Sequence, residues 1–173
     1  MIYVQTINVG RHKVKYSDLT ARYEEFSNAK NTYWNDLAEQ ARDLFSAFET
    51  SLDLPAQTWE DPEGEVHRYA ELGTVENGEF KAGHPFLFKG AANLELPFAI
   101  KLTLERGPNI YPKASVSVGI VLRRAGDQLN VVIKGNQDIG RVVPLASIEG
   151  RFAEVCQDIK AQIVATFNPR IFG

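Results

Sequence analysis

Glu63, Glu65 and His67 are the residues of this chain whose types and spacing best suit a chemical role. On an extended strand, alternate residues project to one face, so two carboxylates and an imidazole would converge and could bind a metal ion. A solvated loop is the competing interpretation, because Pro62 and Gly64 interrupt the acidic run. The loop is favoured, and we expect no metal site.

The rest of the sequence gives little indication of a catalytic nucleophile or of a cofactor-binding site. Cys156 is the only cysteine, and the neighbouring Glu154 and Asp158 disfavour the thiolate that a nucleophile needs, so we expect a packed structural thiol. The chain has no GxxxxGK[ST], GxGxxG, HExxH, GxSxG or Cys-x-x-Cys motif. Segment 135–140 lacks the lysine of a phosphate loop and is interpreted as a turn. We expect no catalytic residues and no cofactor, and the sequence favours a non-enzymatic role.

Two tryptophans are candidate anchors for a partner, because tryptophan is enriched at interface hot spots. Trp34 falls beside an apolar helical stripe, which favours a place in the core. Trp59 stands in a polar loop just before the acidic run, so its ring is a candidate for exposure and for partner binding.

Charge is divided along the chain. Residues 49–80 carry nine acidic side chains and one basic side chain, whereas residues 101–141 carry seven basic and three acidic ones. Such a division can arise from loops and strand edges that have no role, or it can mark two surfaces that orient a partner. The sequence leaves both interpretations open.

Length and composition limit the classes of protein. With 173 residues, 44% of them hydrophobic and 24% charged, residues 1–173 are expected to form a single domain. The net charge of −3 lacks the basic excess of a general nucleic-acid binder. No apolar run approaches the ~20 residues that cross a bilayer, and the first residues lack the layout of a signal peptide. We expect a cytoplasmic protein without a membrane partner.

The N-terminal third is expected to be helical after a short strand at residues 2–9. From Leu19 to Leu52, apolar residues recur at helical spacing and predict a core-facing stripe over residues 18–53. One continuous helix of this length would measure about 54 Å, against roughly 40 Å for the diameter of a compact domain of this size. We therefore favour a break at 28–32, where the stripe is weakest.

From about residue 65 the pattern predicts an antiparallel sheet. Asn77-Gly78 is a strong hairpin signal, because both residues tolerate positive φ. Alternating apolar residues predict strands over 94–104, 116–122 and 129–133, with a short last strand near 141–145. A C-terminal helix is predicted from Ser147, with an apolar stripe at Ile148, Phe152, Val155, Ile159, Ile163 and Phe167. The fold class is therefore α+β, with about six or seven antiparallel strands packed on an N-terminal helical segment and a long C-terminal helix.

Strand parity defines a candidate interaction face. If the even-numbered residues of 116–122 face the helices, Val121 and Arg123 lie on the opposite face, where neighbouring strands add Lys101, Val132 and Lys134. This face is predicted to be small and mildly apolar at its centre, with basic residues at its rim. Such a surface suits a protein partner that has an acidic surface.

By element order alone, the chain resembles the helix-grip (START-like) arrangement, which implies an apolar ligand cavity. Two functions are carried forward. The first is a non-catalytic protein-interaction module, such as an accessory, inhibitor or immunity-type protein of a bacterium or phage. The second is a small-molecule-binding cavity protein, with or without weak enzymatic activity, suggested also by Phe80, Phe86 and Phe88. A closed cavity between sheet and last helix would favour the second function, and a filled core the first. Either function is compatible with a homo-oligomer.

Overall fold

The computed structural model describes residues 13–172, and the strand predicted at 2–9 lies outside them. The chain divides into two compact units, residues 1–33 and 34–173. Within the first unit, the described residues 13–33 hold no buried side chain.

Helix α1 spans Tyr16–Ser51 as one helix of 36 residues, so the predicted break at 28–32 is wrong. Segment 28–32 contains neither glycine nor proline, the residues that interrupt helices most strongly. Extending an existing helix costs little free energy, so a few polar residues of modest helix propensity remain helical within it. The comparison of helix length with domain diameter holds only for a helix inside one compact domain. Residues 16–33 of α1 belong to the first unit and residues 34–51 to the second.

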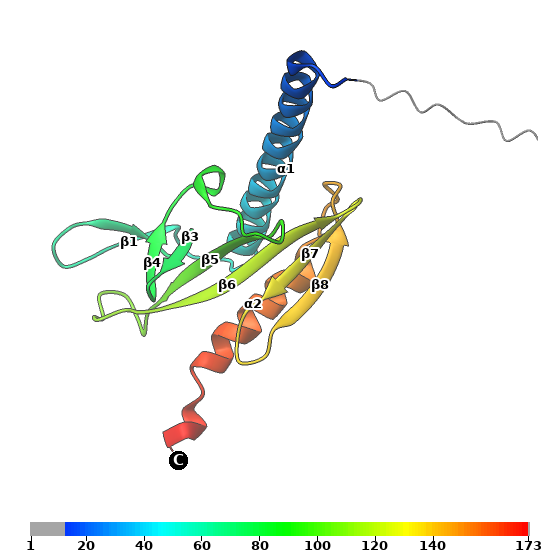
Figure 1. Cartoon of the computed structure of the whole chain (residues 1–173). Helices are drawn as coiled ribbons and strands as arrows, with labels where there is room; N and C mark the ends of the chain where they lie inside the picture. The colour runs from blue at the N-terminus through cyan, green and yellow to red at the C-terminus, as the bar shows by residue number, and fades with distance from the viewer. Residues whose placement is uncertain (1–12, 173) are drawn as a thin grey trace, which may run out of the picture. The chain divides into compact units, whose positions relative to one another are not determined.

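The second unit contains a six-stranded antiparallel sheet in the order β4-β3-β5-β6-β7-β8 (Figure 1). Its strands are β3 (Ala70–Glu76), β4 (Glu79–Ala82), β5 (Leu96–Leu104), β6 (Ala114–Ala125), β7 (Gln128–Ile133) and β8 (Ile139–Pro144). Asn77 and Gly78 join β3 to β4 with φ of 53° and 82°, which confirms the predicted hairpin.

A separate two-stranded hairpin consists of β1 (Thr58–Glu60) and β2 (Val66–Arg68). Two short 3-10 helices, η1 (Pro85–Leu87) and η2 (Pro169–Phe172), complete the described elements. The alternation of apolar and polar residues located β5 to β8, and the Asn77-Gly78 signal located β3 and β4. The separate hairpin β1–β2 was not predicted.

The C-terminal helix α2 spans Ala153–Thr166 and begins later than predicted. Ser147 does not cap it, because Gly150 adopts φ of 74° and turns the chain before the helix starts. Arg151 stabilises this turn by donating to the carbonyl oxygens of residues 144–146, at 2.6–3.2 Å. Ile148, expected in the stripe, is therefore exposed.

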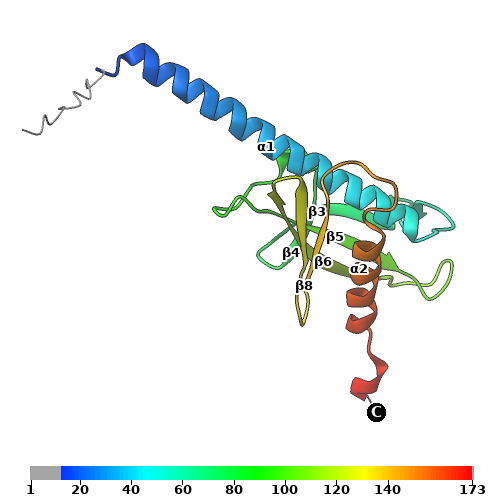
Figure 2. The same cartoon turned by 90° about the vertical axis from the view of Figure 1, so that its right-hand side faces the viewer.

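One face of the main sheet is covered by α2, which packs on β6 and β7, and by the part of α1 in the second unit (Figure 2). The fully buried side chains of this core include Phe48, Ile120, Leu122, Val131 and Ile159. Two arginine–aspartate pairs join helices to the sheet, Arg124–Asp36 at 2.9 Å and Arg141–Asp158 at 2.5 Å. A third, Arg151–Asp43 at 3.1 Å, joins the turn before α2 to α1. The α+β prediction, with sheet, N-terminal helix and C-terminal helix, is confirmed.

Candidate functional site

The face of the main sheet opposite the helices, here called the outer face, carries five of the six predicted partner-binding residues. Val121 lies directly across from Val132 in the register of β6 and β7. Arg123 follows two residues later on the same face, and Lys101 of β5 lies across from Ser117. Lys134 follows β7, and its Cβ lies beside the outer face of Gly119. The fold thus brings these five residues to one face.

An apolar row crosses the outer face. Pro97, Val121, Val132 and Gly140 occupy mutually opposite positions on four successive strands, β5 to β8. The two valines are half-buried, whereas Pro97 and Gly140 are exposed. Val142, the next outer-face residue of β8, is 60% exposed. Apolar side chains are therefore accessible along this row.

The lysines of the outer face are already neutralised by carboxylates of the same chain. Lys101 forms an ion pair with Glu71. Lys134 donates to Asp138 at 2.6 Å, and this hydrogen bond holds the pKa of Asp138 below its usual value. Within residues 13–172, Arg123 makes no ion pair and is exposed. The positive potential expected of the face is therefore concentrated at Arg123.

A hollow of about 460 Å³ adjoins the apolar row, between the outer face and the segment 83–89. Its lining combines apolar and small residues with three charged ones: Ala82, Leu87, Phe88, Pro97, Ala99 and Gly119, and Glu76, Lys81 and Lys89. Ala82, Gly73, Ala99 and Gly119 lie directly across from one another on β4, β3, β5 and β6. Phe80 lies close over Gly73 and Ala99 is buried, so the hollow opens beside this row, towards Leu87 and Pro97. The sequence analysis missed this hollow, because small residues on separate strands align only once the register is known.

Trp59, the sixth predicted partner-binding residue, lies on β1 rather than on the main sheet. Its ring is half-buried and stacks on His67, with centroids 4.7 Å apart. The Lys113 ammonium lies 5.1 Å from the centroids of both Trp59 and Tyr111. Tyr111 also donates its hydroxyl proton to the Glu60 carbonyl at 2.6 Å. These contacts hold the β1–β2 hairpin against the loop between β5 and β6.

The Lys113 side chain is only 4% exposed and pairs with Glu105. The hydrogen bond between them lowers the pKa of Glu105 and raises the pKa of Lys113. Tyr69 is bonded to the same carboxylate, and burial together with that bond raises the pKa of its hydroxyl. The cluster keeps both charged groups in their ionised forms near neutral pH.

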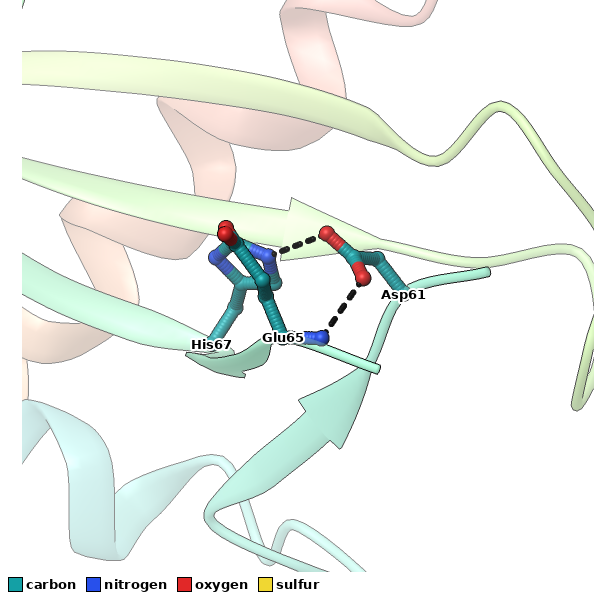
Figure 3. Close-up of side chains that lie close together, drawn as sticks. All are labelled: Asp61, Glu65 and His67. Carbon is teal, nitrogen blue, oxygen red and sulfur yellow. Dashed lines mark hydrogen bonds and ion pairs between the residues drawn. The ribbon is translucent and has the colours of Figure 1, made fainter. Parts of the chain in front are cut away.

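The residues that could hold a divalent cation are Asp61, Glu65 and His67, whose ligand atoms lie within 4.8 Å of one another (Figure 3). Glu63, expected in this set, is not part of it, because the chain turns at 61–65 instead of running as a strand. Asp61 Oδ2 lies 2.8 Å from His67 Nε2, and Oδ1 accepts from the amides of Glu63 and Glu65 at 3.0 and 2.8 Å. These bonds lower the pKa of Asp61. The group closes the hairpin, and a cation would have to displace the bond to His67.

The hollows along α2 are open to solvent and do not form a closed cavity. One, of about 550 Å³, lies between α1 and α2 and reaches Arg151 and Cys156. Another, of about 460 Å³, is lined by Leu102, Ile163 and Phe167 among others. The Cys156 thiol is 2% exposed, and its burial raises its pKa, which disfavours a nucleophilic thiolate.

Comparison with protein-family models, with curated proteins and with solved structures found no match for this chain. Within the described part of the chain, neither α1 nor α2 has the length and apolar character that a membrane crossing requires.

Proposed function

We propose that this protein is a non-catalytic protein-interaction module of accessory, inhibitor or immunity type, acting in the cytoplasm. In this proposal the outer face binds a protein partner that has an acidic surface. The observation that carries the proposal is the apolar row Pro97–Val121–Val132, which no element covers among residues 13–172 and which lies beside the unpaired Arg123.

Binding at this face would combine apolar contacts with one ion pair, formed by Arg123. Interface cores are apolar and depleted in charge, and the apolar row fits that description. The adjoining hollow carries Glu76, Lys81 and Lys89 in its lining and would therefore belong to the polar rim of the interface. An apolar side chain of the partner can enter the hollow beside the exposed Leu87 and Pro97. A partner carboxylate opposite Arg123 would fix the orientation. The exposed Lys134–Asp138 pair is of a kind worth little in water, so Lys134 can exchange Asp138 for a second partner carboxylate.

The filled core supports this function over the small-molecule alternative. Side chains from α1, α2 and the sheet are fully buried between the layers, including Leu44, Ile120, Leu129 and Ile159. A binding protein for an apolar ligand needs an enclosed volume of a few hundred Å³ at that place. The aromatic residues invoked for a cavity lie elsewhere: Phe86 is 42% exposed, and Phe88 lines the hollow on the outer face.

Site-specific photo-crosslinking tests the proposal. A benzophenone amino acid at Val132 should cross-link to a discrete protein in living cells of the native host. The same amino acid at Val164, an exposed position on α2, is the control and should not capture that protein. The captured protein is then purified, and its affinity is measured at low and high salt.

Arg123→Glu should weaken the association by about tenfold or more and flatten its salt dependence, because a partner carboxylate would then face a like charge. Arg170→Glu makes the same charge change at another exposed position and should bind like the wild type. Equal affinity of Arg123→Glu and wild type, in a folded variant, would show that the outer face is solvated surface. Cross-links formed from Val164 but not from Val132 would also show that the outer face is not the binding surface.

A further inference from the structure

The first turns of α1 expose an unusually large apolar surface. Tyr16, Leu19, Tyr23 and Phe26 are 81%, 59%, 71% and 61% exposed, respectively. The sequence predicted a core-facing stripe here, and in the second unit the continuation of that stripe at Leu37 is fully buried. Exposed contiguous apolar side chains on a helix mark a surface that another molecule covers. These four residues are called the α1 stripe below.

The spacing of the α1 stripe is that of a coiled-coil seam. Intervals of three, four and three residues separate Tyr16, Leu19, Tyr23 and Phe26, as at the a and d positions of a heptad. The next seam position is Lys30. A single polar residue in a seam restricts register and oligomeric state at some cost in stability.

We propose that the α1 stripe pairs with the same segment of a second copy of this chain, forming a two-helix homodimer contact. This contact is distinct from the outer face and does not depend on it. The proposal rests on the charges around the seam and on the area that the stripe offers.

The charges around the seam are compatible with a like partner and fit a strongly charged one less well. Residues 15–33 contain three basic and three acidic side chains, so two copies approach without a net repulsion. The positions flanking the seam are mostly small and uncharged: Thr20, Ser27 and Ala29. Arg22, the charged flanking residue, is already paired with Glu25 at 2.9 Å. Nothing in the rim selects a strongly acidic or strongly basic partner.

A lipid surface fits this segment less well. Interfacial amphipathic helices carry lysine and arginine on their polar face, which anionic headgroups attract. The polar side of this segment instead carries Asp18, Glu24 and Glu25. The three basic residues of 15–33 only balance these carboxylates, so anionic headgroups gain no net attraction to the segment.

The available area suits a weak, reversible dimer. Large aromatic side chains bury ~150–250 Å² each, so the three aromatic residues and one leucine of the stripe, at these exposures, offer on the order of 500 Å² per copy. Two copies would bury about 1,000 Å², which lies at the small end of specific interfaces. A contact of this size is expected to dissociate on dilution.

Sedimentation equilibrium of the full chain over a range of concentrations tests the proposal. The wild-type mass should rise with concentration from 19.3 kDa towards about twice that value. Tyr23→Glu combined with Phe26→Glu should weaken association by about a hundredfold or more, because four carboxylates would be buried at the seam. The matched control, Ala21→Glu with Asn28→Glu, adds the same charges to exposed positions off the stripe and should associate like the wild type.

Three results would overturn the proposal. The wild type could remain at 19.3 kDa throughout, or the seam variant could associate as the wild type does. A monomeric wild type that co-sediments with phosphatidylcholine–phosphatidylserine vesicles would identify the stripe as a lipid-binding surface instead. Arg123→Glu should leave self-association unchanged, so failure here is distinguishable from failure of the proposed function.

Discussion

Ile159→Ala is the substitution that tests most directly how α2 packs on the sheet. Ile159 lies in the middle of α2 and is 0% exposed. Its neighbours on the buried side of the helix, Val155 and Ile163, are 0% and 6% exposed. The side chain is therefore enclosed by the core along its whole length.

The expected loss follows from the carbon atoms removed. Shortening isoleucine to alanine deletes three carbons, each worth about 0.8 kcal/mol when buried, or about 2.4 kcal/mol together. The surrounding core relaxes only partly around such a gap, so the free-energy cost of the remaining cavity adds to this value. We expect a loss of about 3–4 kcal/mol, within the ~2–5 kcal/mol usual for such substitutions.

Urea unfolding measured by circular dichroism gives the free energy of unfolding for each variant. Val164→Ala, on the same helix but 72% exposed, is the matched control and should change stability by less than about 0.5 kcal/mol. A loss below about 1 kcal/mol for Ile159→Ala would refute the assigned face of α2, as would equal losses at the two positions.

Two further outcomes are expected. Cys156→Ser should lower the free energy of unfolding by ~1–3 kcal/mol, because a hydroxyl replaces a thiol at a site 2% exposed, while partner binding stays unchanged. The native thiol should also react with Ellman's reagent only after unfolding in urea, and rapid reaction in the native protein would contradict the packing role. The pKa of Asp61 is held below 3.8 by the hydrogen bond to His67 and by bonds from two backbone amides. The contribution of this carboxylate to the free energy of unfolding is therefore present above pH 3.8 and is lost as the pH falls through the lowered pKa. The difference in urea midpoint between wild type and Asp61→Asn should accordingly be present at pH 6 and shrink below about pH 3.8, and a difference that grows in acid would reverse the assignment.

Local pattern determined most of the secondary structure. Alternation over 94–104 fixed both the existence of β5 and the face that it buries, since the period of a strand is set by its own backbone. Asn77-Gly78 fixed a turn for the same reason, because its conformational preference is a property of two residues. The α+β class followed from these local signals taken in order.

Contacts between distant residues were decided by the tertiary structure. Lys101 is neutralised by Glu71 because β3 and β5 are adjacent, although 30 positions separate the two residues in the sequence. Asp61 takes the place expected of Glu63 because the hairpin turns at 61–65. Strand order and loop conformation depend on the whole chain, so a count of charges along the sequence did not predict which charges remain unpaired.

The apolar residues along the whole of α1 show, within one helix, what the sequence determines and what the tertiary structure decides. The sequence by itself determined that residues at intervals of three and four share one side of a helix, because 3.6 residues make a turn. Only the tertiary structure decided that Leu37, Leu44 and Phe48 are covered while Tyr23 and Phe26 are exposed. Periodicity reports which side chains point the same way, and burial depends on whether another surface of the chain reaches them.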